Sequence, residues 1–156
     1  MSESNGYINK SRTDSWATPQ YILDEVLEDA KKNINPDIKL SKFDPCPLND
    51  TPTFDGLDRS CIWKTQVSDD EILYINPPYS ALKSTKKREG WIERIAWEAK
   101  SFNTKICVLI PARTDTQWFH DYCCRIGKIE FMRGRVKFEG AKSSAPFPTM
   151  YWKLNY

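Results

Sequence analysis

The sequence predicts a single α/β domain in which a mainly parallel central sheet is flanked by helices. Segments with helical periodicity alternate along the chain with short apolar segments, which is the order of a parallel sheet with helical crossovers. Three apolar segments end at a proline and lead into polar residues. The 156 residues match the size of one domain, and the 40% hydrophobic and 13% aromatic content excludes a disordered chain.

The first half of the chain predicts one helix and two strands. A helix over residues 18–33 begins with Thr18 as its cap and Pro19 in its first position, and its apolar residues recur at helical spacing. A short strand over residues 39–44 ends where the prolines of the sequence DPCP prevent further pairing. The apolar run EILYIN at residues 71–76 is the second strand, and it also ends at two prolines.

The second half of the chain predicts the remaining helices and strands. Apolar residues over 91–102 recur on one helical face, and the run KICVLI at 105–110 has the continuous apolar character of a strand buried on both faces. A short helix over 114–123 follows. Gly127 separates this helix from a β-rich tail over 128–154.

Composition limits the location and the partners of the protein. Residues 1–13 are polar and aperiodic, which predicts a flexible lead before a single domain over 14–156. No apolar run approaches the roughly 20 residues of a membrane span and no signal peptide is recognisable, so we expect a cytoplasmic protein without a membrane partner. Five cysteines without a CxxC pair, together with a single histidine, favour free thiols and no metal site. The net charge of +2 means that any basic surface is local.

Polar side chains follow each of the three predicted parallel strands. Asp44 comes after the first strand, Asn76 after the second, and Arg113 after the third. Open α/β sheets bind ligands outside the carboxyl ends of their strands. We therefore expect these three residues to lie around one crevice.

The tetrapeptide Asn76-Pro77-Pro78-Tyr79 carries the most informative chemistry. Two adjacent prolines remove two backbone donors and fix two φ angles, which leaves a rigid surface of carbonyl acceptors. The side-chain carbonyl of Asn76 and the ring of Tyr79 add an acceptor and a stacking surface, which suit a planar group with an NH2, such as adenine. Accepting both hydrogens localises the lone pair of the exocyclic nitrogen N6, which can then attack a methyl sulfonium. For the motif alone, the structural alternative is a proline turn with a packed tyrosine.

Several segments, taken in their order, resemble the small phage and prophage DNA N6-adenine methyltransferases that use S-adenosylmethionine, a Dam-like family. The resemblance covers most of the chain. The segments are 16–19 (WATP), 43–46 (FDPC), 55–57 (DGL) with Trp63, 76–80 (NPPYS), 109–116 (LIPARTDT) with 118–119 (WF), 133–138 (RGRVKF) and 145–148 (APFP).

The resemblance implies a Rossmann-like methyltransferase fold and a site-specific enzyme of the host cytoplasm that methylates adenine N6 in DNA after flipping the base. The implied catalytic residues are Asn76, Pro77, Pro78 and Tyr79. Asn76 and the carbonyl of Pro77 would orient N6, and Tyr79 would stack on the flipped base.

The resemblance also implies S-adenosylmethionine as the cofactor. Asp44 and Asp55 would accept hydrogen bonds from its ammonium and ribose hydroxyls, and Thr18 would help to hold its carboxylate. The chain departs from many related enzymes because no glycine follows the Asp-Pro until Gly56. The cofactor residues we expect are Trp16, Thr18, Pro19, Asp44, Pro45, Cys46, Asp55, Leu57 and Asn76.

Cations near the catalytic motif are candidates for contacts with DNA phosphates. For residues 83–88, the alternative to phosphate contacts is a solvated loop. For residues 132–138, the alternative is an ordinary amphipathic edge strand, in which Met132, Val136 and Phe138 would face the core. The DNA-binding residues we expect are Lys83, Lys86, Lys87, Arg88, Arg113, Arg133, Arg135 and Lys137.

Three other functions fit parts of the sequence. A side-chain amide is also a planar NH2 group, so an Asn-Pro-Pro-Tyr loop also suits N-methylation of a protein glutamine. RNA adenine presents the same group as DNA adenine. The glycine-poor cofactor turn favours a DNA-binding module without catalysis.

Overall fold

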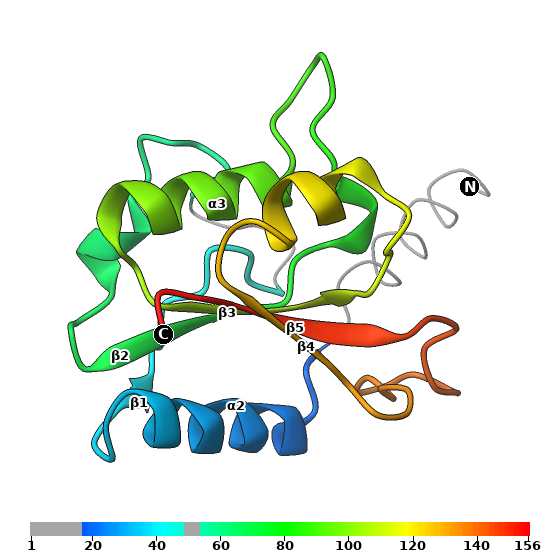
Figure 1. Cartoon of the computed structure of the whole chain (residues 1–156), viewed down its shortest axis with the longest axis horizontal. Coiled ribbons are helices and arrows are strands. Elements are labelled where there is room, and N and C mark those ends of the chain that lie inside the picture. The colour runs from blue at the N-terminus through cyan, green and yellow to red at the C-terminus, as the bar shows by residue number, and fades with distance from the viewer. Residues whose placement is uncertain (1–16, 49–53) are drawn as a thin grey trace.

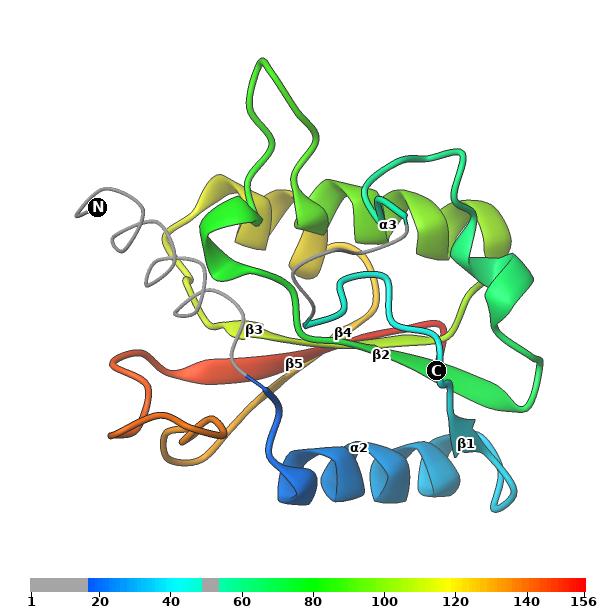
Figure 2. The same cartoon turned by 180° about the vertical axis from the view of Figure 1, so that it is seen from behind.

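Helices cover both faces of a central five-stranded sheet, as Figures 1 and 2 show from opposite sides. The computed structural model describes residues 17–48 and 54–156. The predicted flexible lead and Trp16 lie outside the described residues. Helix α2 (Gln20–Asn33) packs on one face of the sheet, and α3 (Trp91–Phe102) packs on the other.

The sheet is mixed, so the prediction of a mainly parallel sheet is confirmed only in part. Its strands are β1 (Lys39–Leu40), β2 (Glu71–Ile75), β3 (Ile106–Pro111), β4 (Lys128–Phe131) and β5 (Thr149–Leu154). They are arranged in the order β1-β2-β3-β5-β4. The first three strands run parallel, whereas β5 is antiparallel to both β3 and β4. No helix separates β4 from β5, and antiparallel neighbours need no helical crossover.

Strand β3 forms the centre of the core and is buried along its whole length, as its continuous apolar sequence predicted. Alternate side chains point to opposite faces of a strand. Ile106, Val108 and Ile110 accordingly pack on the α3 side of the sheet, and Cys107 and Leu109 pack on the α2 side. The sheet thus separates two apolar clusters, one below each helical layer.

The segments before and after α2 each differ from prediction at one point. Thr18 does not cap the helix; Pro19 is the N-cap, and the hydroxyl of Thr18 lies 2.9 Å from that of Tyr74. Strand β1 is two residues long because the chain turns soon after Ser41, whose amide makes a last bond to the sheet at Ile72.

The segments around β4 also differ from prediction. The short helix after β3 contains a π-helix, η3 (Phe119–Cys123), next to α3 (Figure 1). The predicted β-rich tail over 128–154 is paired only at its two ends, because β4 ends at Phe131 and β5 begins at Thr149, so residues 132–138 do not form the edge strand considered as an alternative. The alternation of burial is nevertheless present: Val136 and Phe138 are buried, and the three cations of this segment are exposed. None of the helices in the described ranges is long and apolar enough to cross a membrane.

Candidate active site

The Asn-Pro-Pro-Tyr motif lies directly after β2, at the carboxyl end of the parallel strands. Pro77 is buried, and Pro78 precedes a short 3-10 helix, η2 (Tyr79–Ala81). This helix turns the ring of Tyr79 back toward the sheet, where its hydroxyl donates a hydrogen bond to Oδ1 of Asn76 (2.8 Å) and also reaches the carbonyl of Leu109 (3.2 Å). The motif is therefore a compact, internally bonded unit.

The other end of the Asn76 amide points toward the N-terminal segment. Its Nδ2 donates to Oγ1 of Thr18 at 3.3 Å, and that oxygen also contacts the hydroxyl of Tyr74. Thr18 is 56 residues from Tyr74 and 58 residues from Asn76 in sequence, so this arrangement depends on the packing of the segment before α2 against the end of β2.

These residues line a cavity of about 220 Å³ at the ends of β1 and β2. Its polar groups are two hydroxyls, a carboxylate and a side-chain amide. The carboxylate suits a ligand ammonium, and the hydroxyl and amide donors suit a carboxylate of the same ligand. The lining residues are Thr18, Leu23, Asp44, Cys46, Leu48, Tyr74 and Asn76. The structure thus brings together four of the predicted cofactor residues.

Asp44 begins the turn that forms one wall of this cavity. Its Oδ1 accepts a hydrogen bond from the backbone amide of Cys46 (2.9 Å), and the thiol of Cys46 donates to the carbonyl of Asn76 (3.4 Å). Desolvation by the surrounding protein raises the pKa of the Asp44 carboxyl above its ordinary value, although the residue as a whole is exposed. The hydrogen bond from the Cys46 amide opposes that shift. A cationic ligand group would relieve the cost of ionising this carboxyl.

Gly56 joins the two predicted cofactor segments. An added Cβ at this position would lie 1.9 Å from the carbonyl oxygen of Pro45, so the two backbones meet where no other residue fits. Asp55 is exposed and its carboxylate accepts from the amide of Leu57, so these two predicted residues lie beside the cavity without lining it. Gly56 sets the distance of Asp55 from the Asp44 turn.

A buried ion pair fastens the segment that follows Gly56 to helix α3. Glu98 accepts hydrogen bonds from the backbone amides of Trp63 and Lys64, and Arg94 donates to the carbonyl of Cys61 at 2.7 Å. The side chains of Arg94 and Glu98 are fully buried and lie 3.2 Å apart.

A second cavity, of about 530 Å³, opens on the other side of the motif. Tyr79 lies at its wall with Phe138 and Phe147, whose rings approach the tyrosine edge to face, with centroids 6.2 and 5.7 Å away. Burial raises the pKa of Tyr79 strongly, so its hydroxyl remains protonated. Aromatic walls suit a flat apolar ring. Tyr79 lines this cavity, and its bonded partner Asn76 lines the smaller one.

The predicted cations occupy separate parts of the surface. Lys83, Lys86, Lys87 and Arg88 are exposed on the loop that projects beyond α3 (Figure 1). Arg113 is exposed just after β3. Its charge is close enough to Tyr79 to offset a small part of the rise that burial causes in the pKa of that hydroxyl. Arg133, Arg135 and Lys137 lie in the exposed segment between β4 and β5.

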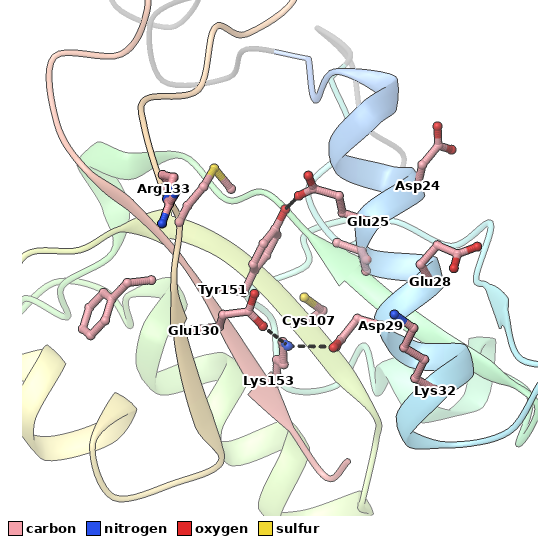
Figure 3. Close-up of a pocket in the computed structure, with 13 residues that line it drawn as sticks. Asp24, Glu25, Glu28, Asp29, Lys32, Cys107, Glu130, Arg133, Tyr151 and Lys153 are labelled. Carbon is pink, nitrogen blue, oxygen red and sulfur yellow. Dashed lines mark hydrogen bonds and ion pairs between the residues drawn. The ribbon is translucent and has the colours of Figure 1, made fainter.

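A third cavity, of about 670 Å³, lies away from the motif, between α2 and strands β4 and β5 (Figure 3). Lys153 lies at its base, 2.8 Å from Asp29 and 2.5 Å from Glu130. Arg133 lines this groove on the side of Glu130, across from the acidic residues of α2. We assign this groove no part in the chemistry of the site.

Three aromatic residues that line these two cavities were absent from our sequence-based site. Tyr74 precedes Asn76 by two positions, and residues two apart share a strand face, so its hydroxyl could have been anticipated. The aromatic wall formed by Phe138 and Phe147 depends on how the segment between β4 and β5 folds over Tyr79, and no local signal indicates this.

An α/β sheet with a polar cavity at its strand ends, an Asn-Pro-Pro-Tyr loop and an aromatic cavity beyond it defines the class of methyltransferases that act on planar amino groups. The comparison with family models agrees: the model described as DNA N-6-adenine-methyltransferase (Dam) matches residues 5–148. The chain belongs to this family of DNA adenine-N6 methyltransferases. Neither the curated proteins nor the solved structures contain a significant match.

Proposed function

We propose that this protein transfers a methyl group from S-adenosylmethionine to N6 of an adenine flipped out of DNA. One observation carries the proposal: the bonded pair Asn76 and Tyr79 lies between two cavities of different character. The polar cavity fits the amino-acid end of the cofactor, and the aromatic cavity fits a base.

The residues of the polar cavity would hold the cofactor by charge and hydrogen bonding. Asp44 would accept from the ammonium, and Thr18 would donate to the carboxylate. Asp55, set in place by Gly56, would accept from the ribose hydroxyls. When bound, S-adenosylmethionine supplies an electrophilic methyl group on a cationic sulfur.

The residues of the motif would prepare N6 for attack. Oδ1 of Asn76 and the carbonyl of Pro77 would accept the two N6 hydrogens while Tyr79 stacks on the base. N6 forms its new bond to the methyl carbon as the carbon–sulfur bond breaks, and the electron pair stays on sulfur. The extra proton on N6 then leaves to water, so no general base is required.

DNA binding would use the exposed cations nearest the motif. The loop that follows the motif by a few residues carries Lys83, Lys86, Lys87 and Arg88. Hydrogen bonds hold the two ends of this loop together. The hydroxyl of Ser84 accepts from the amide of Gly90 and donates to Glu93, each at 2.8 Å. Cations presented on such a loop suit phosphates beside the flipped base. Arg113, Arg135 and Lys137 are further candidates for phosphate contacts on other parts of the exposed surface, and Arg133 is a candidate from the groove that it lines with Glu130.

A methyl-transfer assay with three acceptors tests this function. The protein is incubated with radiolabelled S-adenosylmethionine and unmethylated plasmid DNA, RNA or a glutamine-containing protein, and the product is identified by mass spectrometry. We expect label in N6-methyladenine of DNA. Asn76→Ala should abolish it, and Asn33→Ala, a surface change at the far end of α2, should not.

The other outcomes separate the alternatives. Label in RNA adenine or in glutamine would replace DNA as the substrate. Cofactor-independent DNA binding without transfer to any acceptor would favour the non-catalytic module.

A further inference from the structure

A cavity of about 340 Å³ lies at the foot of the basic loop of residues 83–88, and the function proposed above assigns it no ligand. The start of that loop forms one wall, and residues 116–122, which follow β3, form another. Helix α3 lies beside both segments (Figure 1) and contributes Ile92 and Glu93. The volume falls within the range of about 300–1,000 Å³ that is common for ligand sites.

Apolar side chains form part of the lining of this cavity. Leu82, Ile92 and Trp118 all line it, and each is less than a tenth exposed. Packed aliphatic and indole groups of this kind suit one face of a flat ring. The apolar part of the cavity is therefore compatible with a nucleobase.

Glu93 provides a fixed acceptor in the lining. One of its carboxylate oxygens accepts a hydrogen bond from the hydroxyl of Tyr122 (2.7 Å), and the other accepts from the hydroxyl of Ser84 (2.8 Å). These two hydrogen bonds lower the pKa of Glu93, so its carboxyl is ionised at neutral pH. Each carboxylate oxygen can still accept a further hydrogen bond.

Gln117 and Asp121 add polar groups that are open to a ligand. Both side chains line the cavity and both residues are exposed. Among the residues that the structure describes, neither side chain forms a hydrogen bond or an ion pair. Asp121 offers only acceptors, whereas Gln117 offers both an acceptor and a donor.

The charges of the lining favour an amino group over a phosphate. Two carboxylates, Glu93 and Asp121, face a single cation, Lys83, so a phosphate inside the cavity would be repelled. In the major groove, adenine and cytosine each present an amino donor, whereas guanine and thymine present acceptors. An excess of acceptors in the protein therefore matches adenine or cytosine.

We propose that this cavity binds the amino-bearing edge of a base close to the target adenine, either an adenine or a cytosine, and that Glu93, Gln117 and Asp121 determine this part of the recognition sequence. The inference rests on the function proposed above and deepens it, because phosphate contacts position a protein on DNA whereas base contacts specify the sequence. The cations of the loop hold the backbone beside the base that the cavity reads.

Methylation of a random pool tests this specificity. The full chain is incubated with S-adenosylmethionine and DNA duplexes in which random positions flank an adenine, and the methylated adenines are mapped by sequencing. We expect one flanking position to favour adenine and cytosine over guanine and thymine by about tenfold or more. Gln117→Ala combined with Asp121→Ala should reduce this preference to about threefold or less and leave the other positions unchanged.

The matched control is Gln66→Ala combined with Asp70→Ala. These two residues are exposed, have the same types and the same spacing, and precede β2, whereas the motif follows that strand. This control should keep the wild-type preference.

Deleting the amino group from the DNA tests the contact with the wild-type protein. Purine replaces adenine, or 2-pyrimidinone replaces cytosine, at the position that the pool identifies. We expect kcat/KM for the wild-type protein to fall about tenfold on this change, and kcat/KM for the double variant to fall by about threefold or less. Side chains that serve only the fold would lower kcat/KM equally for both duplexes.

The failures of the two proposals are distinguishable. A wild-type protein that methylates DNA without this preference, or a double variant that keeps it, would overturn the inference and leave the methyltransferase function in place. A wild-type protein that transfers no methyl group to DNA would overturn the proposed function. Duplexes selected from the same pool by binding, with S-adenosylhomocysteine present, would then still show whether the cavity selects adenine or cytosine.

Discussion

Replacing Arg94 by methionine should destabilise the protein strongly, because it would leave Glu98 as a buried charge without its ionic partner. Both side chains are fully buried and 3.2 Å apart. Arg94 also donates to the carbonyl of Cys61, and its guanidinium lies 4.2 Å from the centre of the Trp63 ring. Breaking a buried pair on one side costs about 3–5 kcal/mol. Methionine replaces much of the volume of arginine, so the cost comes mainly from the orphaned carboxylate and the lost hydrogen bonds.

Urea unfolding of the full chain measures this cost. With an m-value of about 2 kcal/mol/M, the predicted loss lowers the unfolding midpoint by about 2 M. The control is Arg59→Met, because Arg59 forms an exposed ion pair with Glu89 and lies 4.6 Å from the Trp97 ring. Exposed pairs contribute less than about 1 kcal/mol, so this variant should shift the midpoint little.

A double variant separates charge from packing. Arg94→Met combined with Glu98→Gln has no buried charge and should be more stable than Arg94→Met alone. If Arg94→Met unfolds at the same urea concentration as Arg59→Met, or if the double variant loses the sum of the two single effects, the buried pair does not hold the segment after Gly56 in the way we describe.

Three further predictions concern the two ligand sites. Gly56→Ala should lower the affinity for S-adenosylmethionine at least tenfold, because its Cβ would lie 1.9 Å from the Pro45 carbonyl oxygen and push the Asp55 segment away from the Asp44 turn; calorimetry measures this. Gly134→Ala is the control for backbone strain, because its Cβ would meet nothing within 4 Å but its φ of 76° is strained for alanine, and it should leave the affinity unchanged. Asp44→Asn should stabilise the ligand-free protein at pH 7 but not at pH 3. A carboxyl with a raised folded-state pKa contributes stability below its unfolded pKa and loses this stability as the pH rises through the folded pKa. Thermal unfolding at both pH values tests the sign, and equal effects of the substitution at the two pH values would contradict it. Lys86→Ala with Lys87→Ala should weaken DNA binding and reduce the slope of log Kd against log salt by up to about two, and an unchanged slope would exclude phosphate contacts at both positions.

The secondary structure was predictable where one local signal dominates. The buried run at β3, the helical periodicity of α3 and the proline-terminated strand β2 all agree with their predicted ranges to within one residue. Within the predicted β-rich tail, residues 132–138 form no strand, because alternating burial also arises in a segment that covers a core without pairing. Strand pairing requires a neighbouring edge, and that information is not local.

The sequence by itself determined the family, the strand-end position of Asn76-Pro77-Pro78-Tyr79 and the acidic turn at Asp44, because prolines stop strands wherever they occur and parallel strand ends meet at one edge. Only the tertiary structure decided what surrounds that motif. The hydroxyl of Thr18 accepts from Asn76 and contacts the hydroxyl of Tyr74 instead of capping α2, and Phe147 reaches Tyr79 from the far end of the chain. The physical reason is that these contacts depend on how α2 and the segment between β4 and β5 pack on the sheet, which is set by burial of their apolar faces across long sequence separations.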